Sequence, residues 1–128
     1  MILKTYSRIF TDDLESTLNV LRAAVGREPE LRVQFRDMEV LTIGDFCILT
    51  GPADSMRPFL GAVGPAIVDD LAETQAVLEE IGAEIISPIT AGPTGWNLFS
   101  RTPDGVTIEW VQWRPDVWEQ VKAASSAA

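Results

Sequence analysis

The chain has 128 residues, of which 46% are hydrophobic and 23% charged, values typical of one globular domain with a real core. Its net charge of −9 argues against a nucleic-acid partner, because phosphate binding needs a concentrated basic face. No apolar run reaches the roughly 18 residues of a membrane helix, and the N-terminus lacks the layout of a signal peptide, so we expect a cytoplasmic protein.

Residues 2–10 are predicted to form the first strand, followed by a helix and three more strands. The helix begins at Asp12, the better N-cap candidate, with Glu15 three residues on as in a capping box, and ends at Gly26. Its apolar stripe comprises Leu14, Leu18, Leu21 and Val25. Residues 31–36 alternate between apolar and polar, as in a strand with two different faces. Residues 38–43 and 46–50 form the next strands, joined by a hairpin turn at Gly44-Asp45.

Residues 51–58 contain two prolines and a glycine and are predicted to connect two halves of the chain. The second half repeats the order of the first. Its elements are a strand at 59–68, a helix from the second Asp-Asp-Leu to Gly82, and strands at 84–87, 96–101 and 106–113, with a loop at 88–95 and a turn at Pro103-Asp104-Gly105. A short helix over 116–124 and a frayed tail end the chain.

One short motif occurs at the start of both predicted long helices, 57 residues apart. The first copy, at residues 11–17, reads TDDLEST, and the second, at residues 68–74, reads VDDLAET. Repetition at a fixed offset indicates two copies of one structural unit, with a binding groove between them. The predicted fold class is therefore α+β: two tandem βαβββ modules with curved mixed sheets enclosing a cavity. Module 1 covers about residues 1–51, the linker 52–58, module 2 59–114, and the C-terminal helix and tail 115–128.

Histidine is absent, and Cys47 is the single cysteine. No internal disulfide can form, which agrees with a reducing compartment. A Ser-His-Asp or Cys-His site is impossible without histidine, and a transition-metal site would depend on carboxylates, carbonyls or Cys47. Since Cys47 lies in an apolar run without positive neighbours, we interpret it as a small core residue.

The duplicated module resembles the vicinal oxygen chelate superfamily, which includes glyoxalase I, extradiol dioxygenases and bleomycin-resistance proteins. Residues 96–112 are similar to the family's C-terminal signature, in which an aromatic strand precedes Asp-Pro-Asp-Gly and a strand bearing Ile-Glu. Here Thr102 stands in for the first Asp, and Ile108-Glu109 keeps the last pair. The resemblance covers about residues 1–114 and implies a homodimer.

In metal-dependent members of that superfamily, the ligands come from the first and last strands of each module. The resemblance places these positions on Tyr6, near Leu49, near Val63 and on Glu109, so that only Glu109 keeps a ligand-type residue. A catalytic divalent metal needs about three protein ligands and an open position. We therefore expect neither a metal nor another cofactor.

Strand alternation predicts which side chains face the cavity. Glu109 and Trp113 share one face of the last strand, while Trp110 packs under a helix, and Trp118 is also interpreted as core. A buried Glu109 would need a partner, expected among Arg8, Arg32 and Arg36. The polar face formed by Arg32, Gln34 and Arg36 either lines the cavity or is a solvated sheet face. The candidate ligand-binding residues are Tyr6, Arg8, Phe10, Gln34, Arg36, Leu49, Trp96, Glu109 and Trp113.

The leading hypothesis is a metal-free protein of the glyoxalase/bleomycin-resistance type that binds an aromatic compound or sequesters an antibiotic, with aromatic side chains around the ligand. The alternative is an enzyme of the same superfamily, an isomerase, lyase or dioxygenase-like protein that is metal-free or weakly metal-dependent. It would use Glu109 or Tyr6 as acid/base, with Arg8 or Arg36 stabilising an oxyanion. A further possibility is an interaction module without a ligand. We expect a homodimer with no nucleic-acid or membrane partner.

Overall fold

Two mixed sheets and four helices make up residues 1–126, the part of the chain described by the computed structural model. The strands are β1 (Ile2–Thr5), β2 (Ser7–Phe10), β3 (Leu31–Phe35), β4 (Met38–Ile43), β5 (Phe46–Thr50), β6 (Ala62–Val68), β7 (Glu84–Ala91), β8 (Gly95–Arg101) and β9 (Thr107–Trp113). The helices are α1 (Leu14–Val25), α2 (Ala53–Met56), α3 (Leu71–Glu80) and α4 (Pro115–Ser126), and the 3-10 helix η1 spans Arg57–Phe59. The α+β class is confirmed, and the last two residues of the predicted tail lie outside the described residues.

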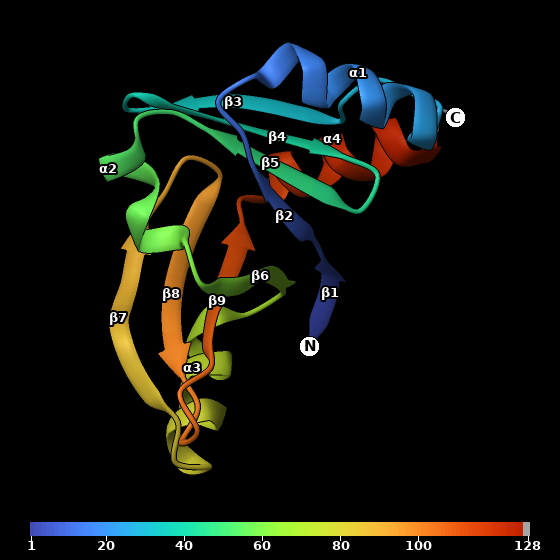
Figure 1. Ribbon diagram of the computed structural model, residues 1–128. Coiled ribbons are helices and arrows are strands. Elements are labelled where there is room, and N and C mark those ends of the chain that lie inside the picture. Colours follow the sequence, from blue (N-terminus) through green and yellow to red (C-terminus); the bar gives the residue numbers. More distant parts are fainter. Residues whose placement is uncertain (127–128) are drawn as a thin grey trace.

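The strand order shows the same unit twice. One sheet has the order β2-β5-β4-β3 and the other the order β1-β6-β9-β8-β7. In each module the first strand pairs in parallel with the last, β2 with β5 and β6 with β9, and the helix follows the first strand. Figure 1 shows the four-stranded sheet across the top under α1, with β7, β8 and β9 running down below it. The tandem βαβββ arrangement is therefore confirmed.

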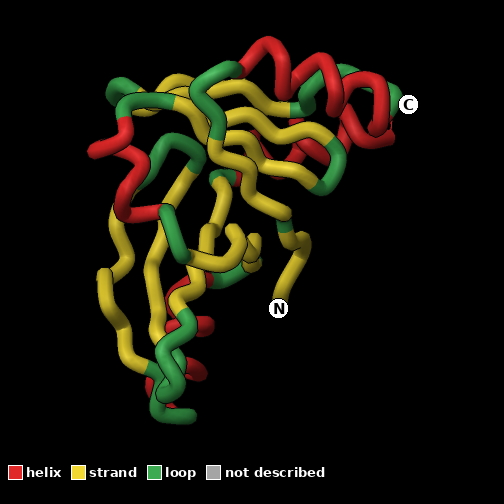
Figure 2. The backbone as a smooth tube through the Cα atoms, in the orientation of Figure 1, coloured by secondary structure: helices red, strands yellow, loops and turns green. Residues whose placement is uncertain are grey.

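The predicted strand over residues 2–10 is divided at Tyr6, and this prediction is corrected. β1 pairs with β6 in the five-stranded sheet, whereas β2 pairs with β5 in the other sheet. The backbone N–H of Tyr6 donates to Pro65 O at 3.1 Å and that of Ser7 to Asp45 O at 2.8 Å, so the two sheets are joined at this point. Figure 2 shows the short break between the two strands near the N-terminus. The first segment therefore links both modules.

The two Asp-Asp-Leu motifs do start helices, but the second aspartate of each is the cap. Asp13 Oδ1 accepts from the Ser16 N–H at 3.2 Å, and Asp70 Oδ1 accepts from the Glu73 N–H at 3.0 Å. The prediction of Asp12 was wrong by one position. An N-cap side chain must reach the amide of the second or third helical residue, and α1 begins at Leu14.

Three further predictions about the second half are corrected. The connection over residues 51–58 contains α2 and continues into η1, so β6 begins at Ala62 rather than at residue 59. β7 runs through Pro88 to Ala91, where a loop was expected. Proline is tolerated there because β7 is an edge strand, and the pairing with β8 is irregular between Ser87 and Thr90.

Three apolar clusters hold these layers together. One lies under α1 and contains Leu18 and Leu21 of the predicted stripe, and another lies under α3 around Leu98. The third joins the two sheets to α4, with Val117 and Val121 of that helix fully packed. Each sheet is thus covered on its outer face, which leaves the inner faces to form a cavity. Within residues 1–126, no helix is long and apolar enough to cross a membrane.

Candidate functional site

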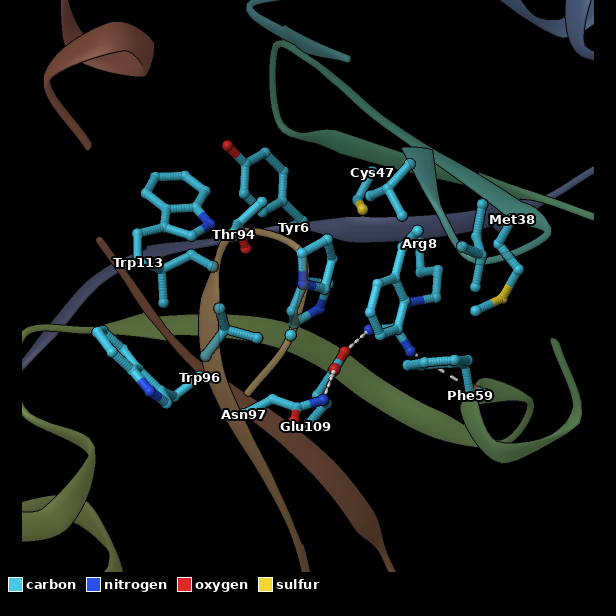
Figure 3. Close-up of a pocket in the computed structure, with 18 of the residues that line it drawn as sticks. Tyr6, Arg8, Met38, Cys47, Phe59, Thr94, Trp96, Asn97, Glu109 and Trp113 are labelled. Atoms are coloured by element: carbon cyan, nitrogen blue, oxygen red, sulfur yellow. Dashed lines mark hydrogen bonds and ion pairs between the residues drawn. The ribbon is translucent and has the colours of Figure 1, made fainter. Parts of the chain in front are cut away.

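A cavity of about 260 Å³ lies between the inner faces of the two sheets. Both sheets supply its walls, and η1 contributes Phe59 at one end (Figure 3). Its lining is mainly apolar and aromatic. It includes Tyr6, Leu31, Phe35, Met38, Val40, Leu49, Phe59, Ile67, Phe99, Val111 and Trp113, with the polar residues Arg8, Arg36, Thr42, Ser87, Thr90, Thr94, Asn97 and Glu109.

A buried ion pair connects the two modules inside this cavity. Arg8 of β2 donates from Nη2 to Glu109 Oε1 of β9, although the two residues are 101 positions apart. Their side chains are only 6% and 7% exposed. The second carboxylate oxygen of Glu109 accepts from Asn97 Nδ2 at 3.1 Å, and Arg8 Nη1 donates to Phe59 O at 3.4 Å. Of the three arginines expected near Glu109, Arg8 is the partner, and each oxygen of the carboxylate accepts one hydrogen bond.

Aromatic rings form much of the cavity wall. The Tyr6 and Trp113 ring centroids lie 6.1 Å apart, and Trp113 also packs against Trp118 at 5.8 Å. Phe59 and Phe99 form another tilted pair at 5.9 Å. Rings in these arrangements present flat apolar surfaces on which a planar ligand can stack.

The four tryptophans divide between the core and the cavity, and the alternation predicted for the last strand separates Trp110 from Trp113. Trp110 packs into the cluster under α3 and donates from Nε1 to Ser100 Oγ at 2.9 Å. Trp118 packs against the cluster that joins the sheets to α4. Trp113 is buried in the cavity lining, whereas Trp96 is 40% exposed at its rim.

The hydroxyl of Tyr6 is buried and has no hydrogen-bond partner among the described residues, and neither does Thr42 Oγ1. In Figure 3 the Tyr6 hydroxyl points away from the pair of Arg8 and Glu109. Burial raises the pKa of Tyr6 well above its ordinary value, although the nearby Thr42 hydroxyl acts in the opposite direction. The phenol therefore stays protonated at neutral pH, so it can donate a hydrogen bond but cannot act as a base.

Cys47 lines the cavity from β5 and is 6% exposed. Burial raises the pKa of its thiol to about 12, even though the nearby Arg8 favours the thiolate. A thiol in this state is a poor nucleophile, because the thiolate is the reactive form. The structure thus agrees with the interpretation of Cys47 as a small core residue.

Seven of the nine candidate ligand-binding residues line the cavity: Tyr6, Arg8, Arg36, Leu49, Trp96, Glu109 and Trp113. Phe10 and Gln34 are not among the lining residues. Phe10 is half-buried at the far end of β2, and Gln34 is exposed on the outer, polar face of β3. The inner face of β3 is the apolar one, with Leu31 and Phe35 in the lining, because alternation separates the two sets.

Sequence reasoning missed three residues that now face the ion pair. Asn97 and Phe99 of β8 lie opposite Val111 and Glu109 of β9, and Phe59 lies in η1. The pairing of β8 with β9 would have identified the first two, but the register between them is not visible in a single sequence. The sequence predicts a strand from residue 59, so no local pattern indicates that Phe59 lies in η1 beside the ion pair.

The cavity lining does not fit a catalytic metal. Among residues 1–126 no group of three or more His, Cys, Asp or Glu side chains comes together. Of the positions implied by the resemblance, Val63 is 58% exposed, Leu49 is apolar and the Tyr6 phenol stays protonated. Glu109 is thus the one ligand-type side chain left at these four positions, and each of its oxygens accepts a hydrogen bond. One engaged carboxylate cannot replace the three or so ligands that such a site needs.

A duplicated βαβββ module with a cavity between its sheets is the vicinal oxygen chelate fold, and the resemblance stated from the sequence is confirmed at this level. The chain is similar to an uncharacterised protein from Methanosarcina mazei, with a TM-score of 0.81 and 29% identity over 89% of this chain and 94% of that one. It is also similar to methylmalonyl-CoA epimerase from Mycobacterium tuberculosis, with a TM-score of 0.69 and 16% identity over 92% and 93% of the two chains.

A mutant of 4-hydroxymandelate synthase from Streptomyces coelicolor matches with a TM-score of 0.51 and 17% identity, over 88% of this chain and 38% of the synthase chain. No family model matches the sequence, and neither does any curated protein. The fold occurs in both enzymes and binding proteins, so the choice between them rests on the cavity itself.

Proposed function

We propose that the protein binds a small planar or aromatic compound in the cavity between its sheets, without a metal ion. The observation that carries the proposal is the state of Glu109, the one carboxylate side chain among the described residues that line the cavity. Its two oxygens accept hydrogen bonds from Arg8 and Asn97, and among residues 1–126 no group of three or more His, Cys, Asp or Glu side chains comes together to hold a metal. Aromatic and aliphatic side chains form most of the rest of the lining. A concave, mostly apolar site with a few placed polar groups is typical of small-molecule recognition.

The size of the cavity limits the ligand. Sites for drug-sized compounds usually measure roughly 300–1,000 Å³, and this one measures about 260 Å³. We therefore expect a compound of one or two rings. A larger natural product would have to extend out of the cavity past Trp96, which lies at the rim.

Intrinsic tryptophan fluorescence tests this proposal, because Trp113 lines the cavity and Trp96 lies at its rim. Titration with a panel of one- and two-ring aromatic compounds should give saturable changes in emission. Trp96→Phe should reduce the ligand-dependent signal. The matched control is Trp110→Phe, since Trp110 packs under α3 away from the cavity. Absence of any saturable change across the panel would refute the proposal.

The proposal that the cavity holds no metal ion has its own test. Elemental mass spectrometry on protein purified without chelator or affinity tag should find metal well below one equivalent per chain. Soaking in zinc, nickel, manganese and iron(II) salts should not change this result. A metal held at one equivalent per chain, and lost in Glu109→Ala, would overturn it.

The same ion pair favours a second candidate, a metal-free enzyme in which Glu109 exchanges a proton with a substrate. A carboxylate buried in a cavity beside a guanidinium is a common arrangement for acid–base chemistry. This candidate predicts turnover that Glu109→Gln abolishes while the protein stays folded. Retained turnover in that variant would remove Glu109 from the mechanism. Tyr6 could serve there only as a hydrogen-bond donor, because its phenol stays protonated.

A further inference from the structure

The charges of the side chains that line the cavity do not sum to zero. They are Arg8, Arg36 and Glu109. Arg8 and Glu109 neutralise each other in the buried ion pair, whereas Arg36 makes no ion pair with any residue among 1–126. The neighbouring Asp37 accepts a hydrogen bond from Ser55 at 2.9 Å instead. The lining therefore carries one uncompensated positive charge in a protein whose net charge is −9.

The backbone at Arg36 is unusual. Arg36 lies in the turn between β3 and β4 with a φ of 57°, and it is the one residue other than glycine with a positive φ among residues 1–126. Glycine adopts that conformation at little cost, whereas an arginine there is strained. The side chain nevertheless stays over Phe35, with its guanidinium carbon 5.1 Å from the ring centroid, and both residues line the cavity.

Arg32 on the same hairpin shows the contrast. It is paired with Glu39 through two hydrogen bonds, of 2.7 and 3.3 Å, on the outer face of the sheet. The two arginines are four residues apart, yet only the outer one has a carboxylate partner among the described residues. The Arg36 guanidinium is exposed and lines the cavity, so without a carboxylate partner among the described residues it is free to bind an anion from outside.

We propose that the ligand is an aromatic anion, with its ring inside the cavity and its carboxylate bound by Arg36 at the rim. This inference rests on the proposed function and adds the charge of the ligand to it. The planar guanidinium matches a carboxylate with two parallel hydrogen bonds. The anionic group stays at the rim because the cavity interior holds Glu109, while Arg8 is already engaged by that residue.

Two probes of nearly the same shape separate charge from ring binding: 2-naphthoate and 2-naphthamide. Their affinities are measured by tryptophan fluorescence or calorimetry. We expect the protein to bind the naphthoate at least about fivefold more tightly, in keeping with a charge-assisted contact that is partly exposed. Added salt should remove much of this preference, since exposed charges are screened.

Arg36→Gln should weaken naphthoate binding about fivefold and leave naphthamide binding within about twofold, because only the anion uses the charge. Arg36→Lys should keep part of the preference, because lysine retains the charge but cannot form the two parallel hydrogen bonds. The matched control is Arg32→Gln, which changes the net charge equally but lies outside the cavity. It should leave both affinities unchanged. Thermal unfolding of each variant shows whether the fold is intact.

The outcomes separate the inference from the function on which it rests. Equal affinity of the protein for the two probes would overturn the anion preference and leave the aromatic binding site standing. Equal weakening of both probes by Arg36→Gln would show that the side chain only shapes the rim, which also overturns it. Failure of both probes to bind would count against the proposed function as well.

Discussion

The buried pair of Arg8 and Glu109 is the feature on which the cavity depends most. Replacing Glu109 by methionine removes the charge and leaves the Arg8 guanidinium buried without a partner, with a side chain 6% exposed. Breaking a buried ion pair in this way costs about 3–5 kcal/mol. Asn97 also loses the acceptor of its side-chain amide. For a domain of this size we expect the unfolding midpoint to fall by roughly 10–20 °C.

The control is the double variant Arg8→Met/Glu109→Met. Replacing both charged partners by apolar side chains of similar volume is often neutral or stabilising, so the double variant should recover most of the lost free energy. The assay is urea unfolding at about pH 7, followed by circular dichroism, with the coupling taken from the double-mutant cycle. A cost below about 1 kcal/mol for Glu109→Met, or additive effects of the two substitutions, would refute the reasoning, because it would mean that water in the cavity solvates both groups.

Four other predictions follow from single contacts. Asp70→Ala removes the acceptor for the Glu73 N–H and should lower the unfolding free energy by about 1 kcal/mol in urea, whereas Asp12→Ala should not change it. Gly95→Ala would place a Cβ 2.1 Å from Gln112 O. It should cost at least about 2 kcal/mol in the same assay, because β8 and β9 must separate there. Tyr6→Phe removes a buried hydroxyl without a partner, so the unfolding free energy should stay equal or rise, and a loss above about 1 kcal/mol would show that the hydroxyl is hydrogen-bonded after all, by Thr42 or by water. Cys47 should react with a thiol reagent at about pH 8 only after unfolding, since its native pKa is raised to about 12.

The raised pKa of Cys47 also gives a pH dependence with a definite sign. The unfolded thiol loses its proton near its ordinary value of 9.0, whereas the buried thiol keeps it to about pH 12. Below pH 9 the thiol is protonated in both states and the free energy of unfolding keeps its full value. Between pH 9 and about pH 12 only the unfolded thiol loses its proton, so the free energy of unfolding falls by about 1.4 kcal/mol per pH unit. Cys47→Ala should lack this decline between about pH 9 and 10, measured by urea unfolding. Parallel pH profiles for the two proteins would contradict the assignment.

Local patterns in the sequence determined the elements and the faces that they present. The repeated Asp-Asp-Leu marked the starts of α1 and α3, because a capping aspartate acts on amides only a few residues away. Alternation along β9 correctly separated Glu109, Val111 and Trp113 from Trp110, because the period of a strand is a property of the backbone alone. These signals were sufficient for the fold class and for seven of the nine candidate residues, although most of the residues that line the cavity were not among the candidates.

Tertiary structure decided everything that depends on how distant segments meet. On sequence evidence, any of three arginines could have paired with Glu109. Arg8 is the partner because the chain passes at Tyr6 from β1 in one sheet to β2 in the other. The division of the first segment at Tyr6 came from hydrogen bonds to Pro65 and Asp45, which no local pattern encodes. Phe59 lies in the site because the connection between the modules forms η1, and Asn97 lies there because of the register between β8 and β9. Hydrophobic periodicity has a range of a few residues, whereas register and sheet order are set by contacts across the whole chain.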